Sequence, residues 1–106
     1  MSDWSREKLD CFIDQKGSGF IYLYTPFCGT CQVSGKMLTV AEALLPEITV
    51  GRINLNYMRE LAEEWAVESV PCLVFLNRGE VTNKLYAFQS VPYLVEKIKS
   101  TLTKKE

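Results

Sequence analysis

Residues 19–32 read GFIYLYTPFCGTCQ, a β-rich apolar run followed at once by two cysteines three positions apart. A continuous run of this kind is typical of a central strand that is covered on both faces. After it, apolar residues recur with helical spacing from about Gly29 to Leu45, and Pro46 ends the pattern. The stretch therefore predicts a strand, a tight turn and a helix, with Cys28 and Cys31 where the helix begins.

Helices and strands alternate on both sides of this stretch. Further helices are expected at residues 4–16, at 57–66 and after Ser90, a suitable N-cap, and further strands at 48–55, 72–76 and 81–88. Gly17 is expected to end the first helix. The glycine-containing NRGE at 77–80 predicts a hairpin between the last two strands. Because strand–helix–strand units cross over right-handedly, the first two strands are expected to be parallel neighbours.

This order predicts one α/β domain over residues 1–106, with a four-stranded mixed sheet flanked by helices on both faces. The apolar faces of the helices carry Leu9, Phe12, Ile13, Met37, Leu38, Ala41, Leu44, Leu45, Tyr57, Leu61, Trp65, Val91, Val95, Ile98 and Leu102, and Trp65 and Phe88 are expected in the core. Binding sites of such sheets lie at the carboxyl ends of the parallel strands. The cysteine pair is expected at that edge.

Composition excludes several classes of protein. The chain has 106 residues, a formal net charge of −1 and no histidine. It lacks the basic face of nucleic-acid binding, and no apolar stretch approaches the ~18 residues of a membrane span. The first residues, MSDWSREKLD, do not have the basic and then apolar pattern of a secretory leader. We therefore expect a cytoplasmic protein that binds neither nucleic acid nor membrane. The charge run TKKE at 103–106 is interpreted as a solvated helix end.

The cysteines are the residues most suited to chemistry. Cytoplasmic thiols are kept reduced, so a permanent structural disulfide is not expected. Structural zinc takes four ligands, and the chain offers neither a histidine nor a second closely spaced pair. A C-x-x-C pair between a strand and a helix instead favours a reversible redox couple. The unpaired amides of the helix start would stabilise a Cys28 thiolate, and Cys31 lies one turn further on the same face.

Two segments resemble the thioredoxin family. FIYLYTPFCGTCQ at 20–32 resembles its active-site strand and helix, with Phe27 where thioredoxins usually carry tryptophan. SVPCLVFLNRGEV at 69–81 resembles its cis-proline loop, the following strand and the hairpin. The similarity runs from about Gly19 to the last helix. The first strand of full-length thioredoxins is expected to be missing, because only MSD precedes the first helix.

The resemblance implies a thiol–disulfide oxidoreductase that reduces protein disulfides through a mixed-disulfide intermediate. Cys28 would be the attacking thiolate and Cys31 the resolving thiol. Pro71 would be cis, and the backbone of Val70 would pair with an extended substrate. The implied contact surface comprises Phe27, Gly29, Thr30, Val70, Pro71 and Ala87. The resemblance also implies a monomer without a cofactor, to which a reductase or a small-thiol pool supplies electrons.

Besides Phe27, four positions differ from the family pattern. Thr30 replaces a proline and would bring a backbone N–H and a hydroxyl toward Cys28, and Tyr22 replaces a buried aspartate. Ala87 replaces a glycine beside the substrate groove, and Arg52 replaces a lysine near the aspartate. The dithiol is intact, but the groups that tune it are changed.

Two other functions stay open at this point. Cys28 could bridge two subunits through an iron–sulfur cluster or another metal, or the fold could be a binding module whose cysteines no longer react. Phe27 could be a substrate contact or part of the packing. Cys11 is interpreted as a peripheral free thiol, and Cys72 as a small core residue.

Overall fold

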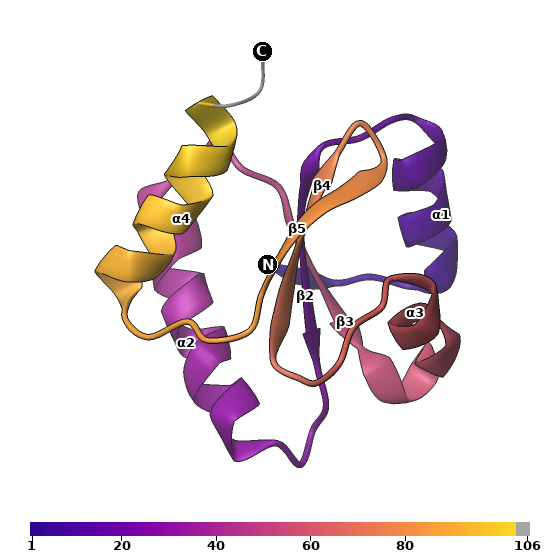
Figure 1. The fold of residues 1–106 in the computed structure, drawn as a ribbon, viewed down its shortest axis with the longest axis horizontal. Helices are drawn as coiled ribbons and strands as arrows, with labels where there is room; N and C mark the ends of the chain where they lie inside the picture. Colours follow the sequence, from indigo (N-terminus) through magenta and orange to yellow (C-terminus); the bar gives the residue numbers. More distant parts are fainter. Residues whose placement is uncertain (104–106) are drawn as a thin grey trace.

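The strand that precedes the two cysteines, β2 (Gly19–Tyr24), lies at the centre of a five-stranded sheet in the computed structural model (Figure 1). The other strands are β1 (Ser2–Asp3), β3 (Val50–Asn54), β4 (Cys72–Asn77) and β5 (Glu80–Leu85), in the spatial order β1-β3-β2-β4-β5. β1 and β3 run parallel to β2, whereas β4 pairs antiparallel with β2 and β5 with β4. The structure describes residues 1–103, so most of the predicted charge run at the helix end lies outside it.

The sheet has one strand more than the sequence predicted, because the first strand is shortened rather than missing. β1 is two residues long, with Ser2 opposite Gly51 and Asp3 opposite Arg52. So short a strand leaves no alternating pattern in the sequence. Tertiary contacts hold the strand in place instead. The Arg52 guanidinium donates to both carboxylate oxygens of Asp3 at 2.7 and 3.0 Å, and the backbone N–H of Trp4 donates to the Arg52 carbonyl at 2.8 Å.

Helices cover both faces of the sheet (Figure 1), and a separate hydrophobic core lies between the sheet and the helices on each face. α2 (Gly29–Leu44) and α4 (Val91–Thr103) cover one face, and α1 (Arg6–Asp14) and α3 (Arg59–Glu64) cover the other. Successive side chains of a strand point to opposite faces. Phe20 and Tyr22 therefore enter the core under α2, and Ile21 and Leu23 enter the core under α1. The apolar run fills both cores, as its sequence predicted.

Most side chains on the predicted apolar helix faces are wholly or partly buried. The fully buried ones are Leu9, Leu38, Ala41, Leu45, Leu61 and Ile98, together with Phe88 from the loop after β5. Leu44 and Tyr57 are instead 59% and 83% exposed. Leu44 is the last residue of α2, and Tyr57 lies in a 3₁₀ turn (Leu55–Tyr57) that precedes α3. Between residues 1 and 103, no helix combines the length and the apolar surface that a membrane span requires.

The helix end expected at Gly17 is present but is built differently. Lys16, rather than Gly17, adopts the left-handed backbone, with φ 61°. The Lys16 N–H donates to the Ile13 carbonyl and the Gly17 N–H to the Phe12 carbonyl, both at 2.9 Å, which are the two bonds of a Schellman motif. Gly17 is needed for space, because a Cβ there would lie 2.6 Å from the Phe12 ring.

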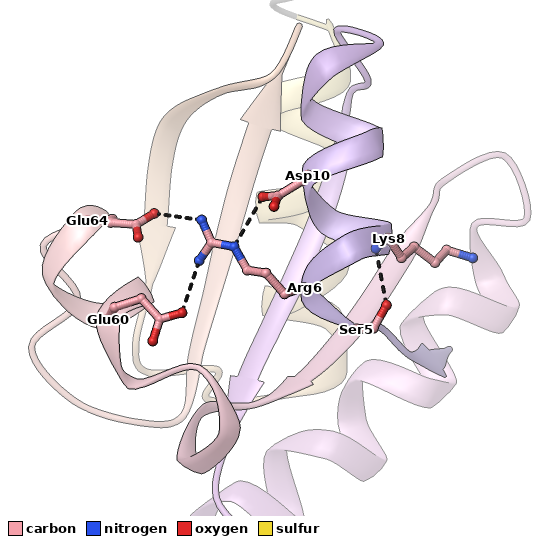
Figure 2. A network of polar contacts seen from close by, with 6 residues as sticks. All are labelled: Ser5, Arg6, Lys8, Asp10, Glu60 and Glu64. Carbon is pink, nitrogen blue, oxygen red and sulfur yellow. Dashed lines mark hydrogen bonds and ion pairs between the residues drawn. The ribbon is translucent and has the colours of Figure 1, made fainter.

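Arg6 links α1 to α3 on the outer surface (Figure 2). Its guanidinium lies 3.1 Å from Asp10 on its own helix, and 3.1 and 3.5 Å from Glu64 and Glu60 on α3. Exposed ion pairs of this kind each contribute little to stability. The network joins the outer surfaces of α1 and α3.

The Asp3–Arg52 ion pair should make the free energy of unfolding depend on pH in the acidic range. Hydrogen bonding to Arg52 lowers the pKa of the Asp3 carboxyl, with partial burial acting in the opposite sense. Because the folded-state pKa lies below the unfolded one of about 3.9, the stabilisation is present above about pH 4 and is lost as the pH falls through the folded value. Asp3→Asn should therefore lower the free energy of unfolding in urea at pH 6, but not at pH 2.

Asp14→Asn, at the end of α1, is the matched control, since no ion pair among residues 1–103 involves Asp14. This variant should follow the wild type at both pH values. An equal loss of stability in Asp3→Asn at pH 2 and pH 6 would contradict the role of the ion pair.

Candidate active site

Three segments that carry the predicted site meet at one edge of the sheet. β2 pairs antiparallel with β4, and β4 with β5, so the carboxyl end of β2 lies beside the amino end of β4 and near the carboxyl end of β5. The cysteine pair follows β2, Val70–Pro71 precedes β4, and Ala87 follows β5. The rings of Tyr22 and Phe88 pack edge to face with centroids 5.9 Å apart, which holds the third segment against the first.

Cys28 is the N-cap of α2 and has an extended backbone, with φ −104° and ψ 108°. Its sulfur accepts a hydrogen bond from the Cys31 N–H at an N···S distance of 3.1 Å. The Thr30 hydroxyl oxygen lies 3.3 Å from the same sulfur. These two donors and the positive end of the helix dipole all favour negative charge on the Cys28 sulfur. The start of α2 is therefore suited to stabilising a thiolate.

Thr30 contributes only part of what the sequence suggested. Its hydroxyl lies at the Cys28 sulfur, as expected, but the backbone N–H that donates to this sulfur belongs to Cys31. The reason is the geometry of a helix start, where an N-cap side chain commonly accepts from the amide three residues later. The expectation that the Thr30 amide would be the donor was wrong.

The two cysteines differ in exposure. They are joined as a disulfide, with Cα atoms 5.1 Å apart. Cys31 is 3% exposed, whereas Cys28 is half-buried and lies at the outer end of the pair. A sulfur of a large partner can therefore approach Cys28 but not Cys31.

Tyr22 occupies the place under α2 where the resemblance implied an aspartate in other family members. Its side chain is 2% exposed, and its hydroxyl donates a hydrogen bond to the Cys31 carbonyl. Burial raises the pKa of Tyr22 to about 12, while the charge of Arg52 acts in the opposite sense. The hydroxyl is therefore a neutral donor throughout the pH range of thiol chemistry.

Arg52 has its side-chain partners outside the cysteine pair. Its guanidinium is bound by Asp3 and lies 5.4 Å from the centre of the Tyr24 ring. In this chain it therefore anchors the first strand. No sequence pattern predicts this role, because Asp3 and Arg52 are far apart along the chain.

The loop before β4 has the conformation that the resemblance implied. The Val70–Pro71 peptide bond is cis, and both residues are half-buried. The Tyr86 hydroxyl accepts a hydrogen bond from the Glu68 N–H at 3.2 Å, which ties this loop to the segment after β5. Sequence reasoning missed Tyr86, because no spacing rule connects it with the loop.

The surface around Cys28 is open. The Phe27 side chain is 99% exposed, so it takes no part in the packing. A Cβ at Gly29 would have no atom within 4 Å, and Thr30 and Ala87 are exposed. Segment 24–35, which contains the pair, and segment 86–95 have no charged residue, while the loop before β4 carries the exposed Glu68.

The other two cysteines lie apart from this edge. Cys72 is fully buried in the core under α1 and α3, and burial raises the pKa of its thiol to about 11. Cys11 is exposed on α1, and its sulfur accepts a hydrogen bond from the side-chain amide of Gln15 at 3.4 Å. Both placements confirm the sequence interpretation of a core residue and a peripheral thiol. Within residues 1–103, no three side chains of the histidine, cysteine, aspartate or glutamate type gather as a metal ion would require.

Comparisons with known proteins agree with this geometry. The family model described as Thioredoxin matches residues 3–100. The thioredoxin-like protein YusE of Bacillus subtilis (strain 168) is 48% identical over 79 residues, which make up 74% of this chain and 74% of that protein.

Solved structures share the fold. Desulfothioredoxin from Desulfovibrio vulgaris Hildenborough, in its reduced form, has a TM-score of 0.81 at 22% identity, covering 94% of this chain and 96% of that one. Human ERp44 has a TM-score of 0.82 at 15% identity; the match covers 94% of this chain but only 31% of that longer one. The α/β architecture predicted from the sequence is confirmed.

Proposed function

The chain belongs to the thioredoxin family and is a thiol–disulfide oxidoreductase, and from this we propose that it acts mainly as a reductant of protein disulfides, with Cys28 as the attacking thiolate and Cys31 as the resolving thiol. The observation that supports these roles is the difference in exposure at one helix start. Cys28 is accessible and its sulfur is met by two donors, while Cys31 is 3% exposed behind it.

Two exchange steps would transfer two electrons to the substrate. In the first, the Cys28 thiolate attacks one sulfur of the substrate disulfide, forms a mixed disulfide and displaces the other sulfur as a thiolate. In the second, deprotonated Cys31 attacks the Cys28 sulfur, forms the Cys28–Cys31 disulfide and displaces the second substrate thiolate. The Cys31 proton passes to solvent, and the substrate thiolates take up protons from solvent.

The proposed contact surface comprises Phe27, Gly29, Thr30, Val70, Pro71 and Ala87. Its lack of charge favours an apolar or neutral segment around the substrate disulfide. The backbone of Val70 is proposed to pair with that segment as an added strand.

The proposal extends to the setting of the reaction. Members of this family act on protein disulfides and receive electrons from a reductase. For this chain we propose a single domain over residues 1–106 that works as a cytoplasmic monomer, with a reductase or a small-thiol pool as electron donor. No cofactor bound to the protein takes part in either exchange step.

The experiment that tests the function is the reduction potential of the Cys28–Cys31 couple, titrated in glutathione buffers. We expect a reduction potential of roughly −250 to −200 mV, a few tens of millivolts above the value near −270 mV that is typical of thioredoxin. A value near the −120 mV of a strong oxidant would reverse the proposed direction. A pair that does not equilibrate with the buffer would favour a binding module without redox activity.

The Thr30 hydroxyl should raise this potential. A hydrogen bond to the Cys28 thiolate stabilises the reduced form, so removing the hydroxyl should make the couple more reducing. We expect Thr30→Val and Thr30→Pro to lower the potential by roughly 10–30 mV, where 30 mV corresponds to about 1.4 kcal/mol. Thr30→Ser, which keeps the hydroxyl, is the matched control and should stay near the wild type. Equal potentials in all four proteins would refute this role of the hydroxyl.

A further inference from the structure

The Tyr22 hydroxyl connects the central strand directly to the first turn of the active-site helix. Tyr22 belongs to β2, and its hydroxyl donates to the carbonyl of Cys31, three residues after the N-cap of α2. In an α-helix this carbonyl also faces the amide of residue 35. A carbonyl oxygen has two lone pairs, so it can accept both bonds.

Gly35 makes room for this contact. A Cβ on Gly35 would lie 3.5 Å from the Tyr22 hydroxyl oxygen and 3.6 Å from the ring. These distances are ordinary van der Waals contacts, so the methyl group of an alanine would fit, whereas a branched side chain directed at the ring would displace it. Glycine inside a helix costs roughly 0.5–1 kcal/mol relative to alanine, and at this position it allows the ring to lie against the helix backbone.

The tyrosine ring is held on two further sides. It stacks on Tyr24 with an interplanar angle of 9° and centroids 5.8 Å apart, and it meets the edge of Phe88 at 5.9 Å. With a side chain that is 2% exposed, the ring has little freedom to move. Its hydroxyl is therefore a fixed point for the helix start.

We propose that Tyr22 is a positioning residue for the second exchange step: by holding the Cys31 carbonyl against β2, it keeps the Cys31 sulfur within reach of Cys28. Only residues 25–27 separate Cys28 from the end of β2. The strand therefore positions Cys28 through this short segment of the chain and positions Cys31 through the tyrosine. The inference rests on the proposed roles of the two cysteines. Closure of the disulfide ring depends on this geometry, whereas the first attack by Cys28 does not.

The test measures ring closure without any protein substrate. The reduced full chain is mixed with oxidised glutathione, and mass spectrometry follows both the Cys28–glutathione mixed disulfide and its conversion to the internal disulfide. Tyr22→Phe removes only the hydroxyl and should slow conversion by about two- to tenfold, the range expected for one intramolecular hydrogen bond. The rate of mixed-disulfide formation should stay within about twofold of the wild type, because the first attack by Cys28 does not depend on this hydrogen bond.

Tyr24→Phe is the matched control, since it removes from the same strand a hydroxyl that is bonded to Asp3 instead. It should leave both rates unchanged. Unchanged conversion in Tyr22→Phe, or equal slowing in Tyr24→Phe, would overturn the inference.

If Tyr22→Phe does not fold, Gly35→Val gives the second test, because its side chain should push the hydroxyl off the helix and slow conversion. Normal conversion in that variant would also overturn the inference. A chain that closes its ring normally but does not reduce protein disulfides would instead refute the proposed function.

Discussion

Cys31→Ser should capture disulfide-containing proteins as stable mixed disulfides through Cys28, while Cys28→Ser should capture none. The first variant keeps the accessible sulfur and the donors around it but has no thiol to complete the second exchange. The second variant has lost the nucleophile that a protein disulfide can reach, because Cys31 is 3% exposed. Turnover of a fluorogenic disulfide peptide should fall to the buffer background in both.

The captured species are separated on non-reducing gels and released with dithiothreitol. Cys11→Ser in the Cys31→Ser background is the matched control, because Cys11 is the other exposed thiol. Its capture should equal that of Cys31→Ser alone. Equal capture by Cys28→Ser and Cys31→Ser would show that the two roles are not divided as proposed.

Gly51→Ala should destabilise the chain more than its small change in size suggests. A Cβ at this buried position in β3 would lie 2.5 Å from two atoms of the Trp4 ring and 2.9 Å from the ring nitrogen. Trp4 is 7% exposed and packs edge to face on Phe12 at 5.0 Å, so the ring cannot retreat without breaking that contact. Overpacking of this kind costs about 1–3 kcal/mol, which exceeds the ~0.4–1 kcal/mol that alanine gains over glycine from the unfolded chain.

The loss should appear as a fall in Tm of about 4–8 °C for each kcal/mol in a domain of this size. Gly29→Ala is the control for stability, because a Cβ there would have no neighbour within 4 Å. Its Tm should equal that of the wild type or exceed it slightly. A Gly51→Ala protein as stable as the wild type would mean that the Trp4 ring can shift at no cost.

Local patterns were sufficient to predict most of the fold. β2 and β4 are continuous apolar runs, and both occur where the sequence placed them. β1 could not be predicted, because its two residues are held by Arg52 and Trp4 rather than by any periodic pattern. The exposed Tyr57 has a similar explanation. Its spacing matched the helix that follows, but the chain turns through a 3₁₀ segment before α3 begins.

The candidate site divides in the same way. The cysteine pair lies within one helical turn, and its spacing together with its place between a strand and a helix indicated redox chemistry. The hydrogen bond from Tyr22 to the Cys31 carbonyl depends on how closely α2 packs on the sheet, and the tyrosine lies beside Gly35, thirteen positions further along the chain. The resemblance implied that Tyr22 stands where family members carry an aspartate, but it did not show what the tyrosine would contact.

The sheet also limits how many covalent forms this chain can adopt. Four cysteines can form two disulfides in three different arrangements. A chain with a disulfide other than Cys28–Cys31 would be unable to carry out the exchange reaction. Cys72 is enclosed under α1 and α3, on the opposite face of the sheet from α2, and Cys11 lies on the outer surface of α1. The folded chain therefore has one internal ring to open and close, and each molecule should accept or deliver two electrons per cycle without isomerising into an inactive species.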